Sequence, residues 1–175
     1  MTTSASNISN SSKYFVYFDG KTIETTVTNK AEIVNQWVQL ILLKCAGKPT
    51  VVGLDNEWRP HPVPYMSNKS ATLQLCIDDN CLIVDKDIMK LKDEYGLKCT
   101  KSADIREVAK MRWPGRFSRP GLKDLAREVS GLYMKKPLHV TKSQWDARVL
   151  SADQVEYACI DAYASYKIGN MLLLN

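Results

Sequence analysis

A short apolar run that ends in two acidic residues constrains the fold of this chain most. Val51–Leu54 has the length and composition of a buried strand, and Asp55 and Glu57 follow at its end. An unpaired carboxylate in a low-dielectric setting costs several kcal/mol, so these groups must be hydrated, paired or bound to metal. Because side chains two residues apart on a strand share a face, the pattern predicts a strand that carries two carboxylates to one point.

A second acidic motif, Tyr157-x-x-x-Asp161, lies far along the chain on a pattern typical of a helix. A helix places residues at this spacing on one face, so the two motifs together can pool three carboxylates and a phenol. Carboxylates are hard oxygen ligands that suit Mg²⁺ or Mn²⁺. The two histidines, His61 and His139, are far apart and both adjoin prolines, which gives little support to a histidine metal site or a Ser-His-Asp triad.

The composition is that of one globular domain. The chain has 175 residues, of which 45% are hydrophobic and 25% charged, enough to bury a full core. We expect a disordered polar tail over residues 1–12 and a single domain over residues 13–175. The net charge of +5 and the pI near 8.9 allow a polyanionic partner such as nucleic acid.

No apolar run reaches the roughly 18 residues of a membrane span, and the first residues lack the features of a secretory signal. We therefore expect no membrane association and no secretion, with the protein in the nucleus or the cytoplasm. The five cysteines are odd in number and form no C-x-x-C pair, which favours reduced core thiols over disulfides or zinc ligands.

The remaining sequence alternates between strand and helix signals. Asp19-Gly20 predicts a hairpin between strands at residues 14–18 and 22–27, and Asn29 with Glu32 predicts the N-terminal cap of a helix. Three prolines make residues 59–64 a stiff exposed loop. The other expected elements are strands at 71–77, 81–84 and 102–105, helices at 87–95 and 121–130, and a last helix that begins at the capping box Ser151-x-x-Gln154 and runs near Leu174.

Five motifs follow one another in an order that resembles a known family. They are, in chain order, Val52-Gly53-Leu54-Asp55-Asn56-Glu57-Trp58, Ala71-Thr72-Leu73-Gln74-Leu75-Cys76, Asp87-Ile88-Met89-Lys90-Leu91, Gly121-Leu122-x-x-Leu125-Ala126, and Trp145 with Tyr157-Ala158-Cys159-Ile160-Asp161-Ala162-Tyr163-Ala164. The chain resembles Werner-syndrome-type exonucleases, and within them a plant-type member of the DEDDy branch of DnaQ-like 3′-5′ exonucleases. The resemblance covers about residues 51–174 and implies an α/β ribonuclease-H-like fold, with a mixed sheet flanked by helices.

The resemblance implies roles for five residues. Asp55 and Glu57 match the first motif, whose carboxylates hold metal ions; Asp87 matches the second; Tyr157 and Asp161 match the third. The implied activity is hydrolysis of nucleic acid from its 3′ end with two Mg²⁺ or Mn²⁺ ions, which activate the attacking water and stabilise the leaving oxygen. The Tyr157 hydroxyl would orient that water.

Two interpretations remain open for the other candidate residues. Trp58 and Trp145 either line the substrate groove or are core aromatics. The basic stretch from Arg106 to Lys123 either tracks a phosphate backbone or is a solvated loop with packed aromatics. Its candidate substrate-binding residues are Arg112, Arg116 and Arg119.

The stretch after Val84 departs from the family pattern. In the family, a helix and a further strand parallel to the first separate this position from the second-motif aspartate, whereas here Asp87 follows almost directly. The chain is therefore expected to lack an internal helix-strand unit of roughly 25 to 30 residues. The missing strand would lie beside the strand of Asp55 and deliver Asp87 to the site.

Two classes of function follow. The first is a metal-dependent 3′-5′ exonuclease whose activity is weakened by the lost unit. The second is a catalytically impaired relative that binds nucleic acid or protein through the same surface. The expected partners are a 3′ end of DNA or RNA, further copies of the chain, and a separate helicase chain.

Overall fold

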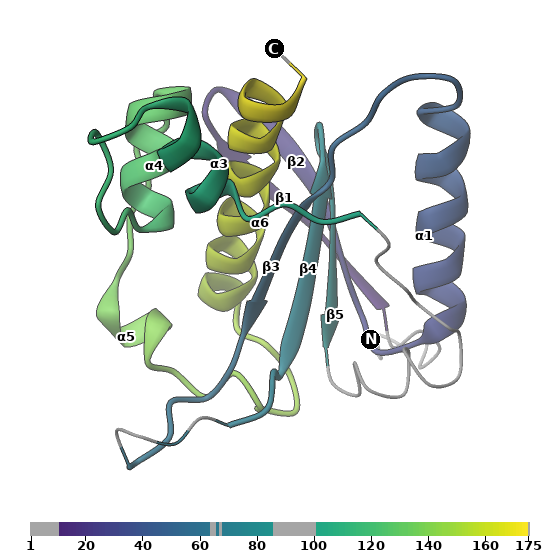
Figure 1. Ribbon diagram of the computed structural model, residues 1–175. Helices are drawn as coiled ribbons and strands as arrows, with labels where there is room; N and C mark the ends of the chain where they lie inside the picture. Colours follow the sequence, from purple (N-terminus) through teal and green to yellow (C-terminus); the bar gives the residue numbers. More distant parts are fainter. Residues whose placement is uncertain (1–10, 64–65, 67, 86–100, 175) are drawn as a thin grey trace, which may run out of the picture.

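The computed structural model describes residues 11–63, 66, 68–85 and 101–174, which form a mixed five-stranded sheet with helices on both faces (Figure 1). Among the described helices, one covers one face of the sheet, while the C-terminal helix lies on the other face with two further helices packed against it. The helices are α1 (Ala31–Lys44), α3 (Ile105–Arg112), α4 (Leu122–Ser130), α5 (Leu138–Thr141) and α6 (Ala152–Leu173). The architecture is the mixed α/β sheet that the sequence predicted.

The sheet has the strand order β1-β2-β5-β4-β3. Its strands are β1 (Ser11–Phe18), β2 (Lys21–Thr28), β3 (Gly53–Glu57), β4 (Thr72–Ile77) and β5 (Asn80–Asp85). β2 runs parallel to β5, and the other pairs are antiparallel. Within the described part of the chain, β3 is an edge strand that pairs with β4 alone.

Most of the predicted elements are present. The hairpin turn forms at Asp19 and Gly20, whose φ angles of 55° and 70° are those of the left-handed region that Asp-Gly favours. The capping box of α6 is confirmed, because Ser151 Oγ accepts from Gln154 N at 3.2 Å and Gln154 Oε1 accepts from Ser151 N at 2.9 Å. The acidic strand, expected to begin at Val51, begins two residues later at Gly53 and includes both acidic residues up to Glu57.

Two local predictions were wrong, and two helices were not predicted. Helix α1 begins after Lys30 without a side-chain cap, because Thr28 Oγ1 instead accepts from the Lys30 amide at 3.1 Å. The strand expected at 102–105 is absent, since Asp104 caps α3 by accepting from Arg106 N at 2.9 Å. Both α3 and the one-turn α5 lie in stretches that the sequence left without helices. The helix expected at 87–95 lies outside the described residues.

Cys76 and Cys81 form a disulfide, so the prediction that all cysteines are reduced was wrong for this pair. The two residues are directly paired across the β4–β5 ladder, which brings their side chains together on one face. Cys45 and Cys159 are free, and burial raises the pKa of the Cys159 thiol to about 12, as expected of a core thiol.

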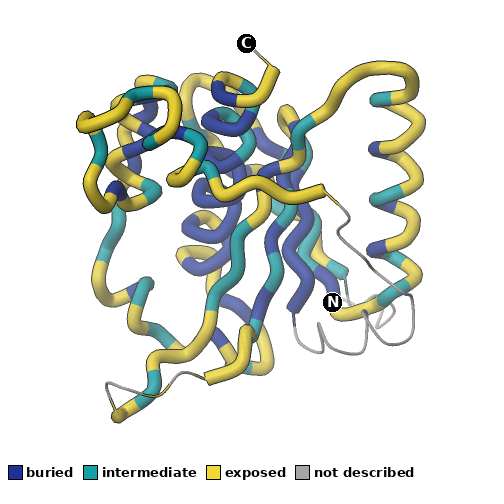
Figure 2. Tube along the Cα trace, in the orientation of Figure 1, coloured by how far each residue is buried: buried dark blue, intermediate teal, exposed yellow. Residues whose placement is uncertain are grey.

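Helix α6 is buried around most of its circumference, because the sheet lies on one side and α3 and α4 on the other (Figure 2). Its close approach to β3 depends on Gly53. A Cβ at Gly53 would lie 2.2 Å from the carbonyl oxygen of Ala162 and 2.3 Å from the amide nitrogen of Tyr166. The missing side chain thus brings α6 against the acidic strand. No described helix has the length and apolar character that a membrane crossing requires.

Candidate metal centre

Three carboxylates meet where β3 ends against α6. Asp55 and Glu57 lie on the face of β3 that looks toward the helix, since they share the side of Gly53 in the strand's alternation. Asp161 comes from α6 and is buried. Carboxylate oxygens of the three residues lie within 4.8 Å of one another, close enough to hold a common cation.

Tyr157 lies one helical turn before Asp161 and is also buried. Its ring packs against the Trp145 ring, with centroids 5.7 Å apart and planes tilted by 55°. Its hydroxyl lies 3.1 Å from Lys136 Nζ and 3.3 Å from Thr141 Oγ1. The phenol is therefore held in one orientation beside the carboxylates.

Lys136 is the cation within this cluster. Its ammonium donates to Asp161 Oδ2 as well as to Tyr157, and it lies 4.6 Å from the centre of the Tyr157 ring. Burial opposes its charge, but Asp161 and the Tyr157 hydroxyl outweigh that cost and raise the pKa of Lys136. Sequence reasoning missed this residue, because only the tertiary fold brings it to the acidic motifs.

The site disfavours negative charge. Burial, with the neighbouring carboxylates, raises the pKa of Glu57 to about 8. Burial raises the pKa of Asp161 to about 7 against the opposing effect of Lys136, and it also raises the pKa of Asp55 although Asn56 N donates to that carboxylate at 2.9 Å. One buried and two partly buried carboxyl groups with raised pKa values are the electrostatic condition that a bound cation relieves.

The other predicted site residues lie in different places. Asp87 lies outside the described residues. Trp58 follows Glu57 and is 45% exposed, as a groove residue can be, whereas Trp145 is fully buried behind Tyr157 and donates from Nε1 to the Thr141 carbonyl at 3.3 Å.

The predicted substrate-binding arginines lie toward the far end of α6. Arg112 donates to the carbonyl oxygens of Met171 and Leu172 at 3.1 Å and 3.4 Å, near the last turn of that helix. The rise of an α-helix separates Leu172 from Asp161 by about 16 Å. Arg116 pairs with Glu128 at 3.1 Å and, like Arg119, lines a shallow hollow of about 300 Å³. The structure does not bring these arginines to the carboxylates.

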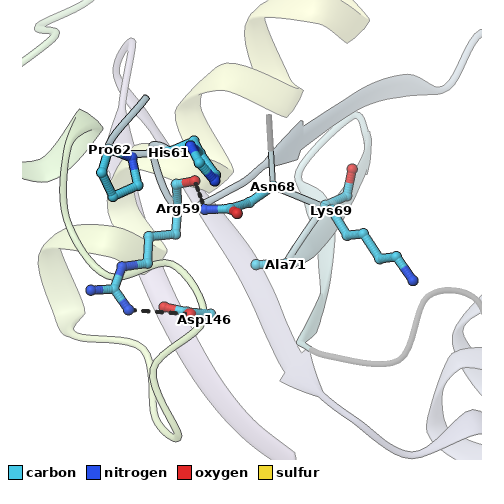
Figure 3. A pocket seen from close by; sticks show the side chains of 8 residues that line it. Arg59, His61, Pro62, Asn68, Lys69, Ala71 and Asp146 are labelled. Carbon is cyan, nitrogen blue, oxygen red and sulfur yellow. Dashed lines mark hydrogen bonds and ion pairs between the residues drawn. The ribbon is translucent and has the colours of Figure 1, made fainter. Parts of the chain in front are cut away.

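A larger hollow of about 630 Å³ is lined mainly by residues of the segment between β3 and β4. Figure 3 shows Arg59 reaching toward Asp146, with 3.6 Å between Nη1 and Oδ2, while Lys69 extends away from this pair. The Ala71 amide on its wall donates to the backbone carbonyl of Glu57 at 2.8 Å, so one wall residue is bonded to the end of β3. Sequence reasoning described only a stiff loop here and did not predict the hollow.

Comparison with known sequences gives a consistent family. A profile described as 3′-5′ exonuclease matches residues 84–175. A 3′-5′ exonuclease of Arabidopsis thaliana is 28% identical over 69% of this chain and 52% of its own length. A putative 3′-5′ exonuclease of Acanthamoeba polyphaga mimivirus is 46% identical over 190 aligned positions, covering 87% of this chain and 46% of that protein. The mouse bifunctional Werner exonuclease/helicase is 26% identical over 69% of this chain but only 11% of its own length.

Solved structures share the fold at low identity. Escherichia coli RNase D superposes with a TM-score of 0.64 at 16% identity, covering 85% of this chain and 44% of that one. Trypanosoma brucei RNase D in complex with RNA gives 0.63 at 19% identity, covering 86% and 63%. The chain spans about half the length of the Arabidopsis and mimivirus relatives. Because the family profile matches more than half of its 175 residues, and because the sheet and helices have the RNase D-like arrangement, this chain belongs to the DnaQ-like 3′-5′ exonucleases, a family of hydrolases that act on phosphodiester bonds.

Proposed function

We propose that this chain removes nucleotides from the 3′ end of DNA or RNA in a reaction that requires Mg²⁺ or Mn²⁺, and that it is a plant-type relative of the Werner-type branch. The observation that carries the proposal is the meeting of Asp55, Glu57 and Asp161 beside Tyr157 in a chain of the exonuclease family. The similarity to the Arabidopsis exonuclease supports a plant-type relative, and the partial similarity to the mouse Werner protein supports the choice of branch.

The donor atoms fit a hard divalent cation. Three carboxylates offer oxygen ligands within 4.8 Å of one another, and a buried acidic cluster needs positive charge. We assign Asp55, Glu57 and Asp161 as metal ligands, with Asp87 as a fourth. Two bound ions would supply an activated water and charge stabilisation for the leaving oxygen.

Tyr157 positions the attacking water in this proposal. Its ring is held by Trp145 and its hydroxyl by Lys136, so the phenol points in one direction without needing to reorganise. A water bound by this hydroxyl would attack the last phosphodiester, and the products would be mononucleoside 5′-phosphates. The carboxylates and the phenol would form the catalytic set.

The hollow beyond β3 would give a strand of nucleic acid a route to the site. Arg59 and Lys69 provide positive charge for phosphates, and the exposed Trp58 offers a face on which a base can stack. Trp145 would act on the substrate indirectly, by supporting Tyr157. Arg112, Arg116 and Arg119 would contact only a more distant part of a long substrate.

The test is digestion of labelled single-stranded and 3′-recessed DNA and RNA with Mg²⁺ or Mn²⁺. Asp55→Ala, Glu57→Ala and Asp161→Ala should each lower the rate at least about a hundredfold, because each removes a ligand. Tyr157→Phe should slow turnover while metal binding, measured by calorimetry, stays intact. Asp78→Ala removes an exposed carboxylate in the β4–β5 turn and is the matched control.

Polarity separates this activity from that of an endonuclease. Blocking the 3′ hydroxyl should stop digestion, and chelation should abolish it. Cuts within a closed circular substrate would contradict the exonuclease proposal. Unchanged digestion by the double variant Asp55→Ala with Asp161→Ala would remove the metal-dependent mechanism altogether.

A second candidate function, a catalytically impaired domain that binds nucleic acid or protein, is favoured by the position of β3 at the edge of the sheet that the described strands form. Leu54 faces the side that α1 covers over β4 and β5, yet it is 53% exposed. The mimivirus alignment has more positions than this chain has residues, so some of them face gaps here, and the family match begins only at residue 84. These observations support the proposal that a helix-strand unit beside β3 is missing.

Restoring that unit distinguishes the two functions. β5 continues to Asp85, so the family-like helix and strand should be inserted after this residue rather than before it. If the missing unit limits the enzyme, the insertion should raise both the melting temperature and the rate of digestion. It would pair the edge of β3 that no described strand pairs, and it would cover apolar surface. Full metal-dependent digestion by the chain without the insertion would contradict the second candidate.

A further inference from the structure

The segment before α5 carries two neighbouring lysines in different environments. Residues 132–136 alternate between the core and the surface, with Leu132 and Met134 buried and Lys135 exposed. Lys136 turns inward, and its side chain is 26% exposed. Its ammonium bonds to Asp161 and to the Tyr157 hydroxyl and covers the Tyr157 ring. The ammonium therefore contacts two residues of the candidate centre.

The charge of Lys136 acts on the whole carboxylate cluster. Carboxylate oxygens of Asp55, Glu57 and Asp161 lie within 4.8 Å of one another, and the positive charge of Lys136 attracts each of the three groups. A cation in this position makes the three acids tolerable in a protein without bound metal. Its hydrogen bond to Asp161 also engages an oxygen that a divalent cation would need.

Lys136 and a divalent ion cannot both be bound closely to the same carboxylate oxygen. Like charges repel at short range, and the repulsion is stronger in a partly buried site than in water. The ammonium has an alternative position, because its contacts with the Tyr157 hydroxyl and ring do not depend on Asp161.

We propose that Lys136 is a built-in counter-cation of the carboxylate cluster and that a divalent ion displaces its ammonium from Asp161 when it binds. This inference rests on the metal dependence in the proposed function, but it concerns how the charge of the carboxylates is balanced in the metal-free site. The lysine stabilises the metal-free protein and weakens metal binding, and metal entry frees an ammonium beside the Tyr157 hydroxyl.

The test compares Lys136→Met with Lys135→Met, which removes the same charge one residue away from an exposed position. Mn²⁺ is titrated into each protein by calorimetry without nucleic acid, and melting is followed in chelator in the same buffer. Lys136→Met should bind Mn²⁺ at least about tenfold more tightly than wild type, and it should melt at a lower temperature in chelator. Lys135→Met should match wild type in both measurements.

Lys136→Gln keeps a polar side chain and serves if the methionine variant does not fold. An unchanged or weaker affinity for Mn²⁺ in the folded Lys136 variant would overturn the proposal. Unchanged metal affinity with weaker oligonucleotide binding would also overturn it, and would assign Lys136 to the substrate instead. If the Lys136 variant binds Mn²⁺ more tightly but no variant digests nucleic acid, the counter-cation stands and the exonuclease proposal fails.

Discussion

Gly53→Ala tests whether the contact between β3 and α6 assembles the site. The new Cβ would lie 2.2 Å, 2.3 Å and 2.8 Å from the Ala162 oxygen, the Tyr166 nitrogen and the Tyr166 Cα. All three are backbone atoms, so no side chain can rotate away. Ordinary contact begins near 3.4 Å, and β3 and α6 must therefore separate by about 1.2 Å. That movement would pull Asp55 away from Asp161.

The structure sets the size of the effect. Overpacking costs about 1 to 3 kcal/mol, and a clash of backbone against backbone belongs at the upper end. For a chain of this length, about 3 kcal/mol lowers the melting temperature by about 6 to 12 °C. A displacement of about 1 Å at a reacting centre can lower the rate about a hundredfold. The rate of digestion should therefore fall strongly even under conditions where the variant is still folded.

Melting in chelator and Mn²⁺ calorimetry measure the two effects separately. Gly121→Ala is the control, because φ at Gly121 is −77° and the nearest atom to the added Cβ is Asp124 Oδ2 at 3.5 Å. It should change stability by less than about 1 kcal/mol. A Gly53→Ala protein that melts within about 2 °C of wild type and keeps its Mn²⁺ affinity would refute the reasoning.

Two further predictions concern charge at and beside the site. Burial raises the pKa of Asp161 to about 7 and of Glu57 to about 8, so the folded protein binds more protons than the unfolded chain between about pH 4 and pH 8. The melting temperature in chelator should therefore fall as pH rises through this window. Saturating Mg²⁺ should reduce that fall. A melting temperature in chelator that rises over the same window would contradict these shifts. Arg59→Gln should weaken binding of a single-stranded oligonucleotide in chelator and lower the slope of log affinity against log salt by about 0.7, as expected for one lost phosphate contact. Lys13→Gln, at an exposed position of β1 outside both basic regions, is the control. An unchanged slope in Arg59→Gln would exclude that arginine from the path of the nucleic acid.

Local signals predicted much of the fold. Asp19-Gly20 favours a tight hairpin turn, and Ser151-x-x-Gln154 specifies where α6 begins. Both signals act through backbone atoms a few residues away. The acidic motifs were likewise visible, since strand and helix periodicities state which side chains share a face. How β3 meets α6 was not visible, because it depends on a glycine in contact with a helix distant in sequence.

The features that sequence reasoning missed depend on tertiary contacts. Nothing in Lys135-Lys136 distinguishes the buried lysine from the exposed one until the segment is placed against α6. The Cys76–Cys81 disulfide follows from the strand register, which composition does not specify. The general rule that disulfides are rare in intracellular proteins led to the wrong prediction for this pair. That rule does not consider whether two cysteine side chains face each other across a ladder.

The position of β3 links the stability of this chain to its site. An edge strand held by one ladder partner depends on packing for the rest of its support, and for β3 that packing is the contact with α6. The same contact brings Asp55 and Glu57 to Asp161, so a cation bound between them would connect strand and helix. A ligand that binds only the folded state stabilises it by an amount that grows with the ratio of its concentration to its Kd. Metal should therefore stabilise the fold of this protein as well as take part in the proposed reaction, because it would join a strand that has one ladder partner among the described residues to the central helix.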